Sequence, residues 1–195
     1  MTRKIKYLDG PRLQLAITAG IHSVLSRQEY LNKINVFPVA DGDTGTNMAF
    51  TLNSILDKTS LKSHKRVDDL LCIVADSALD GARGNSGVIF AQFFQGFSTG
   101  SKGLDRLTTK HFSNAMHSAS EHARNALSNP VEGTILTVLT DFSNHLQNNI
   151  NDGSMDDFEI LLETGLKAAE ESLNETPKKL KILKSSGVVD AGAQG

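Results

Sequence analysis

The sequence predicts an all-α fold of about eight antiparallel helices. Apolar residues recur every three or four positions along most of the chain, which is the spacing that places them on one face of a helix. The segments between these periodic stretches are short, so consecutive helices are expected to run antiparallel. No stretch shows convincingly the alternation that is typical of a half-buried strand.

Three helices are predicted in the first half of the chain. The first begins at residues 9–11, where Pro11 occupies a position that tolerates its missing N–H group, and extends to Asn32. The second begins near residue 46 and is followed by a loop over 60–65. The third covers residues 67–79. Their apolar faces are formed by Leu13, Ile17, Ile21, Val24 and Leu25, by Met48, Leu52, Ile55 and Leu56, and by Leu70, Leu71, Val74, Ala75 and Ala78.

The second half of the chain predicts five more helices. Residues 86–97 are strongly apolar, and their length and position after a glycine turn favour a buried helix over a strand. Residues 151–154 are interpreted as a loop. The remaining helices are predicted over 108–127, 133–150 and 158–173, with a short final helix that begins at Pro177.

The composition excludes several classes of protein. A chain of 195 residues with 39% hydrophobic content fits one soluble globular domain. Its net charge of -2, with scattered Lys and Arg, argues against nucleic-acid binding, and no segment is apolar enough to span a membrane. The single cysteine, Cys72, lies in an apolar run, so we expect a buried thiol and a reducing, cytoplasmic environment.

The most informative motif covers residues 35–48, Asn-Val-Phe-Pro-Val-Ala-Asp-Gly-Asp-Thr-Gly-Thr-Asn-Met. Asp41 and Asp43 flank a glycine, and residues 44–47 are of the types that end a loop and cap a helix. Two carboxylates so close together favour a compensating cation, and Mg²⁺ often uses one or two carboxylates plus substrate phosphates. A helix start directly downstream favours those phosphates. The motif therefore predicts a metal and phosphate site.

Each of these motifs also has a simpler structural interpretation. An isolated Asp-Gly-Asp-Thr-Gly is more often a polar turn with a helix cap, and Gly-Asn-Ser-Gly at 84–87 is by itself typical of an interhelical turn. An EF-hand calcium loop is excluded, because Thr46 replaces its sharp-turn glycine and Leu52 its bidentate glutamate. The chain contains no Walker loop, and its histidines lack metal-binding spacing.

Three motifs together resemble the nucleotide-binding domain of dihydroxyacetone kinases, in the form carried by bacterial fatty-acid kinases. They are residues 35–48, residues 81–89 (Gly-Ala-Arg-Gly-Asn-Ser-Gly-Val-Ile) and residues 187–195 (Gly-Val-Val-Asp-Ala-Gly-Ala-Gln-Gly), in the order of that family. The resemblance covers essentially the whole chain. It implies an eight-helix antiparallel barrel with the nucleotide at one end. It also implies that residues 1–195 are a single kinase domain, the N-terminal part of a longer chain.

The resemblance implies roles for individual residues. Asp41 and Asp43 would be the catalytic metal ligands for one or two Mg²⁺ ions, with Asn35 near the place of a third aspartate in dihydroxyacetone kinases. An arginine that those kinases place upstream of the closing motif is absent near 176–177, which implies weaker nucleotide retention. The residues expected to bind ATP or ADP are Thr44, Gly45, Thr46, Asn47, Gly84, Asn85, Ser86, Gly87, Gly133, Thr134, Asp190, Ala191 and Gly192.

The implied function is an ATP- and Mg²⁺-dependent phosphotransferase. Its acceptor would be a fatty-acid carboxylate, presented by a DegV-like lipid-binding partner or fused domain. Such a carboxylate, with a pKa of roughly 4 to 5, is already ionised and needs no general base. Two alternatives stay open: a non-enzymatic module that senses ATP or ADP, and a kinase subunit acting on dihydroxyacetone or another polyol. The second is disfavoured by Asn35 and the missing arginine.

Overall fold

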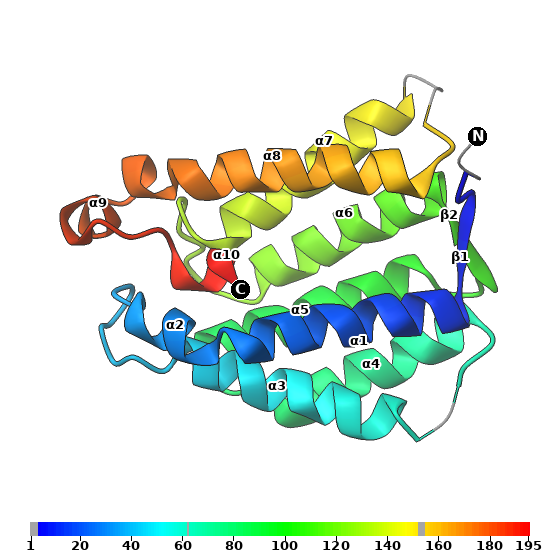
Figure 1. The fold of residues 1–195 in the computed structure, drawn as a ribbon, viewed down its shortest axis with the longest axis horizontal. Helices are drawn as coiled ribbons and strands as arrows, with labels where there is room; N and C mark the ends of the chain where they lie inside the picture. Colours follow the sequence, from blue (N-terminus) through cyan, green and yellow to red (C-terminus); the bar gives the residue numbers. More distant parts are fainter. Residues whose placement is uncertain (1–3, 62, 152–154) are drawn as a thin grey trace.

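The computed structural model describes residues 4–61, 63–151 and 155–195, and this part of the chain is almost entirely helical (Figure 1). The all-α class is therefore confirmed. The elements in chain order are β1 (Tyr7–Asp9), α1 (Gly10–Ser26), α2 (Gln28–Lys33), α3 (Thr44–Thr59), α4 (Val67–Gly81), α5 (Gly84–Gly100), β2 (Arg106–Thr108), α6 (Thr109–Asn125), α7 (Ile135–Asn151), α8 (Phe158–Lys179), α9 (Lys181–Ser186) and α10 (Ala191–Gln194).

The first predicted helix is in fact two helices, α1 and α2. Asp9 caps α1 as expected, because its side chain accepts a hydrogen bond from the N–H of Arg12 at 3.1 Å. Arg27 then leaves the helical conformation, with φ -108° and ψ 8°. This break turns α2 towards the start of α3. The split and the short α10 account for ten helices within the described residues instead of the predicted eight.

The long helices pack side by side, and each helix from α3 to α8 contacts the next one in sequence (Figure 1). Helices α5 and α6 lie close together, since a Cβ on Gly96 would lie 2.5 Å from the carbonyl oxygen of Ser118. The core includes edge-to-face aromatic contacts of Phe112 with Phe97 and Phe158, with ring centroids 6.0 and 5.5 Å apart. The apolar segment over 86–97 is confirmed as part of helix α5.

Two short strands were not predicted. β1 and β2 pair antiparallel, with Leu8 opposite Leu107. Each has only three residues, which is too short for an alternating pattern to be recognised in the sequence. They lie at the end of the molecule opposite α9 and α10 (Figure 1). Beside them, Asp157 caps α8, and its Oδ1 accepts hydrogen bonds from the N–H groups of Ile5 and Glu159, each at 3.2 Å.

Two further expectations were wrong. Pro177 lies inside the last turns of α8, and the short helix that follows begins at Lys181 after an extended Leu180. Cys72 is exposed, because the helical period turns Leu71 and Val74 into the core and leaves residue 72 on the outer face of α4.

Two expectations remain, on the loop over 151–154 and on membrane-spanning segments. Residues 152–154 of the predicted loop over 151–154 lie outside the described residues. Within the described ranges, no helix is both long and apolar enough to cross a bilayer.

Candidate functional site

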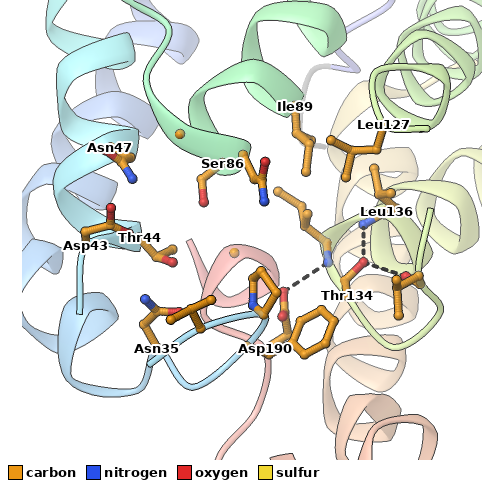
Figure 2. Close-up of a pocket in the computed structure, with 18 of the residues that line it drawn as sticks. Asn35, Asp43, Thr44, Asn47, Ser86, Ile89, Leu127, Thr134, Leu136 and Asp190 are labelled. Carbon is orange, nitrogen blue, oxygen red and sulfur yellow. Dashed lines mark hydrogen bonds between the residues drawn. The ribbon is translucent and has the colours of Figure 1, made fainter. Parts of the chain in front are cut away.

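A cavity of about 390 Å³ is lined by the segment between α2 and α3, by α10 and by the starts of α3, α5 and α7 (Figure 2). These segments are far apart in the sequence, and the packing of the helices brings them together. The lining residues are Asn35, Phe37, Pro38, Val39, Asp41, Asp43, Thr44, Asn47, Gly84, Asn85, Ser86, Ile89, Leu127, Asn129, Val131, Thr134, Ile135, Leu136, Asp190 and Gly192.

One side of the cavity is acidic and rich in oxygen atoms. The Nδ2 of Asn35 donates a hydrogen bond to Oδ1 of Asp41 at 2.7 Å, and the Asn35 side chain is only 5% exposed. Its other polar atom, Oδ1, is buried and has no partner among the described residues. Asp43 occupies the N-cap position of α3, but its side chain makes no capping hydrogen bond. Both carboxylates therefore remain available to a ligand.

The donor set of this corner fits a hard divalent cation. No Lys, Arg or His is among the residues that line the cavity, and no described ion pair includes Asp41 or Asp43. Two carboxylates and the unpartnered amide oxygen of Asn35 are the oxygen ligands that Mg²⁺ prefers. Across the described residues there is no group of three or more His, Cys, Asp or Glu side chains suited to a metal. A cation here would thus need further oxygen atoms from a molecule bound in the cavity.

The start of α5 faces the same cavity with free backbone donors. Gly84, Asn85 and Ser86 are the first residues of this helix, and within the described chain their N–H groups have no acceptor. The preceding Arg83 provides no side-chain cap. Gly84 has φ +58°, and a Cβ there would lie 2.4 Å from Nδ2 of Asn47. Glycine therefore allows α5 to begin directly against α3, at the edge of the cavity.

The start of α7 has a different character, because its donors are satisfied within the protein. The N–H of Ile135 binds Oδ2 of Asp190 at 3.0 Å, and the N–H of Leu136 contacts Oγ1 of Thr134 at 3.4 Å. The N–H of Gly133 binds Oγ1 of Thr137 at 2.8 Å. The side of the cavity next to this helix start, called the α7 wall below, is formed by Leu127, Thr134, Ile135 and Leu136. Figure 2 shows Leu127 and Leu136, together with Ile89 of α5, across the cavity from Asn35, Asp43 and Thr44.

Asp190 is the third carboxylate of the cavity, and it is 5% exposed. Its Oδ2 accepts hydrogen bonds from the N–H groups of Ile135 and Ala193, at 3.0 and 2.9 Å. Burial raises the pKa of this carboxyl above its ordinary value, although hydrogen bonds from Ala193, Ile135 and Gly192 act in the opposite direction. Asp190 therefore joins two segments of the cavity lining.

The cavity gathers eleven of the sixteen residues that the sequence singled out. These are Asn35, Asp41, Asp43, Thr44, Asn47, Gly84, Asn85, Ser86, Thr134, Asp190 and Gly192. Gly45, Thr46, Gly87, Gly133 and Ala191 do not line it.

Three of the five residues outside the lining contact neighbouring elements instead. The Oγ1 of Thr46 accepts a hydrogen bond from Asn32 Nδ2 at 2.9 Å, and a Cβ on Gly45 would lie 2.3 Å from the carbonyl oxygen of Gln28. Similarly, a Cβ on Gly87 would lie 2.7 Å from Oγ1 of Thr51. These positions allow helices to approach closely, a requirement that a glycine motif shares with phosphate binding.

Nine lining residues were not identified from the sequence as part of a site. They are Phe37, Pro38, Val39, Ile89, Leu127, Asn129, Val131, Ile135 and Leu136. Phe37, Pro38 and Val39 lie within the motif over 35–48 and Ile89 within that over 81–89, but no role was predicted for them individually. Leu127, Val131, Ile135 and Leu136 cannot be told from other apolar positions in the sequence. The exception with a signal is Asn129, which precedes Pro130 in a predicted helix break next to the expected nucleotide-lining segment.

Fold and site together define an all-α domain in which an acidic corner faces an uncapped glycine-rich helix start. The chain belongs to the DAK2 domain family, which matches residues 38–195, and so to the dihydroxyacetone kinase family. This result confirms the resemblance to the dihydroxyacetone kinase family. Individual relatives align with almost the whole chain, and so with residues before position 38 as well.

Three relatives illustrate the alignment. The chain is 36% identical over 191 residues to Protein YloV of Bacillus subtilis, which covers 98% of the chain and 34% of that protein. It is 40% identical over 183 residues to the MG369 homolog of Mycoplasma pneumoniae, covering 90% of the chain and 32% of the relative. It is 35% identical over 191 residues to SERP0792 of Staphylococcus epidermidis, covering 98% and 34%. The chain thus spans about a third of the length of these relatives.

Proposed function

We propose that the chain is the nucleotide-binding domain of an ATP- and Mg²⁺-dependent phosphotransferase. The observation that carries this proposal is the pairing, in one cavity, of the Asp41 and Asp43 carboxylates with the free N–H groups at the start of α5. A polyanion alone would be repelled by the carboxylates, because no cationic side chain lines the cavity. A divalent cation resolves this conflict, since it attracts both the carboxylates and the phosphates of a nucleotide.

The two walls of the cavity suggest how the nucleotide lies. The start of α5 offers three free backbone donors, so the phosphates belong there. The α7 wall offers apolar surface from Leu127, Ile135 and Leu136, and its helix-start donors are already bonded, so it suits the base. The cavity volume of about 390 Å³ falls within the usual range for small-molecule sites. Base and phosphates would then occupy opposite sides.

The residues present favour an acceptor that is already ionised. Bound Mg²⁺ would supply charge neutralisation at the phosphates, held by Asp41, Asp43 and Asn35. The α5 start would orient the phosphates and keep them in line with the acceptor. The titratable side chains of the cavity are Asp41, Asp43 and the internally bonded Asp190, so no free general base remains for a hydroxyl acceptor. A carboxylate needs no such base.

The rim of the cavity agrees with an apolar acceptor molecule. Val39 is 62% exposed and Val131 is 37% exposed, and both line the cavity. We therefore propose a fatty-acid carboxylate as acceptor, presented by a DegV-like lipid-binding partner or by a further domain of the same protein. The resemblance of Asn35 and its motif to fatty-acid kinases supports this choice over dihydroxyacetone or another polyol.

A second candidate function is a non-enzymatic module that senses ATP or ADP. The lack of a cationic side chain in the lining favours it, because such a side chain often stabilises the transferred phosphoryl group. Turnover separates the two functions. The kinase function predicts that ATP loses phosphate when a lipid-loaded partner is supplied, whereas the sensor function predicts binding without turnover.

The test of nucleotide binding is the double variant Asp41→Asn/Asp43→Asn. Calorimetric titration with ADP and Mg²⁺ should show loss of Mg²⁺-dependent affinity, while the circular dichroism spectrum keeps its helical form. The matched control is Asp57→Asn/Asp76→Asn, which removes the same charge from exposed positions outside the cavity. An unchanged ADP affinity in the first double variant would reject the proposal.

A further inference from the structure

Asp190 connects three elements around the cavity. One carboxylate oxygen, Oδ2, accepts hydrogen bonds from Ile135 at the start of α7 and from Ala193 in α10. The backbone N–H of Asp190 donates to Oγ1 of Thr176, near the end of α8, at 3.2 Å. Thr176 is fully buried, and Asp190 is 5% exposed. A single residue therefore joins the α7 wall of the cavity to the segment that forms its floor.

That floor segment, residues 188–195, depends on tertiary contacts for its position. Helix α10 has only four residues, which is far too short to be stable alone. It is reached through Gly187, which has φ +66° and no atom within 4 Å of a Cβ built there, so the chain is loosely packed at this point. Ala191 is 4% exposed, and a Cβ on Gly195 would lie 2.6 Å from the Cε of Met48. The segment is thus held at Asp190 and by packing on either side of Gly192.

We infer that Asp190 is a positioning residue, which holds the α7 wall and the floor segment together as one unit and so couples ligand binding to docking of that segment. Its Oδ2 is occupied by two backbone N–H groups, so this oxygen acts through the protein rather than on the ligand. Thr134 and Ile135 from the wall and Gly192 from the floor line the same cavity. If the floor is docked in only a fraction of molecules, the apparent affinity falls by that fraction.

The coupling is reciprocal. A ligand that contacts both wall and floor stabilises the docked segment by the same factor by which docking improves its affinity. The nature of this ligand, a nucleotide with Mg²⁺, rests on the proposed function. The joining of the α7 wall to the floor segment by Asp190 does not depend on that function, because it consists of hydrogen bonds within the free protein.

The test compares Asp190→Ala with Asp190→Asn. Both N–H groups bind the same oxygen, so the amide oxygen of Asn can replace it, whereas Ala removes the acceptor altogether. Hydrogen exchange of the Ile135 and Ala193 amides, followed by NMR, reports docking in the free protein. Calorimetric titration with ADP and Mg²⁺ reports affinity. We expect Asp190→Ala to accelerate exchange at both amides and to raise the Kd about tenfold or more, and Asp190→Asn to restore most of both.

Asp157 provides a matched control at the other end of the molecule. Its side chain is also buried, at 8% exposure, and its Oδ1 also joins two elements by binding the N–H groups of Ile5 and Glu159. Asp157→Ala should lower the midpoint of urea unfolding as Asp190→Ala does, yet leave the ADP affinity and the exchange of Ile135 unchanged.

Several outcomes would overturn the inference. Unchanged amide exchange in Asp190→Ala would show that the residue does not hold wall and floor together. Faster exchange with unchanged affinity would show that docking and binding are not coupled. If Asp190→Asn kept its amides protected but bound ADP as weakly as Asp190→Ala, the carboxylate would act on the ligand directly.

Asp190 can still be tested if the wild-type protein binds no nucleotide or if Asp190→Ala does not fold. If the wild-type protein bound no nucleotide, the proposed function would fail, and the exchange data would still decide whether Asp190 joins the two segments. Should Asp190→Ala not fold, Thr176→Val takes its place, because it removes the acceptor of the Asp190 N–H group and otherwise only the bond from Thr176 to the Leu173 carbonyl within α8. Unchanged exchange at Ala193 in that variant would count against the inference.

Discussion

The contact between Gly84 and Asn47 offers a sharp test of how the cavity is built. We predict that Gly84→Ala both destabilises the protein and damages the cavity. Gly103→Ala is the matched control, because both glycines have positive φ, +58° and +79°. The new methyl group at residue 103 would have no atom within 4 Å, whereas at residue 84 it would lie 2.4 Å from Nδ2 and 3.0 Å from Cγ of Asn47.

The expected magnitudes follow from these two environments. Alanine in the left-handed region costs about 1–2 kcal/mol. The reduced entropy of the unfolded chain offsets about 0.4–1 kcal/mol of this. Gly103→Ala should therefore lower the free energy of unfolding by about 1 kcal/mol. Gly84→Ala should lower it by about 2 kcal/mol, because Asn47 must also leave its rotamer, at a cost of about 1 kcal/mol.

Urea denaturation measures the stability of both variants, and calorimetry with ADP and Mg²⁺ measures their affinity. Gly84→Ala should bind ADP much more weakly, since Gly84 and Asn47 both line the cavity, whereas Gly103→Ala should bind like the wild type. Equal destabilisation of the two variants, together with equal affinity, would refute the argument that α5 begins against α3 because residue 84 is glycine.

Three further predictions concern pH, helix packing and the thiol. The raised pKa of Asp190 means that its contribution to stability is fully present below the ordinary value of 3.8 and is lost as pH rises through the raised pKa. Urea titrations across this range should therefore show Asp190→Asn gaining stability relative to the wild type as pH rises. Glu132 has a pKa lowered by hydrogen bonds from Thr137 and Arg124, so its contribution to stability is lost as pH falls, and this loss is the same in both proteins. Gly96→Ala should part α5 from α6 and cost about 1–3 kcal/mol, partly offset by the better helix propensity of alanine, and a thermal melt would detect it. Cys72 should react with a thiol reagent in the folded protein as fast as an exposed thiol, and slow labelling would contradict its position on α4.

The sequence by itself determined the helical class and the position of most long helices. Helical periodicity is a local property, since residues three and four apart share a face whatever lies beyond it. The acidic motif over 35–48 could be interpreted for the same reason, because a close pair of carboxylates next to a helix start restricts the chemistry without knowledge of the fold. Family membership also followed from the motifs alone.

Only the tertiary structure decided which residues share the cavity. Adjacent residues in one motif separate there, since Asn47 lines the cavity while Thr46 binds Asn32 on α2. Apolar side chains such as Leu127 and Leu136 cannot be told from core residues until the helices are packed. The burial of Asp190 and the exposure of Cys72 were decided in the same way. Burial and hydrogen bonding depend on neighbours that are distant in the chain, and no local pattern specifies those neighbours.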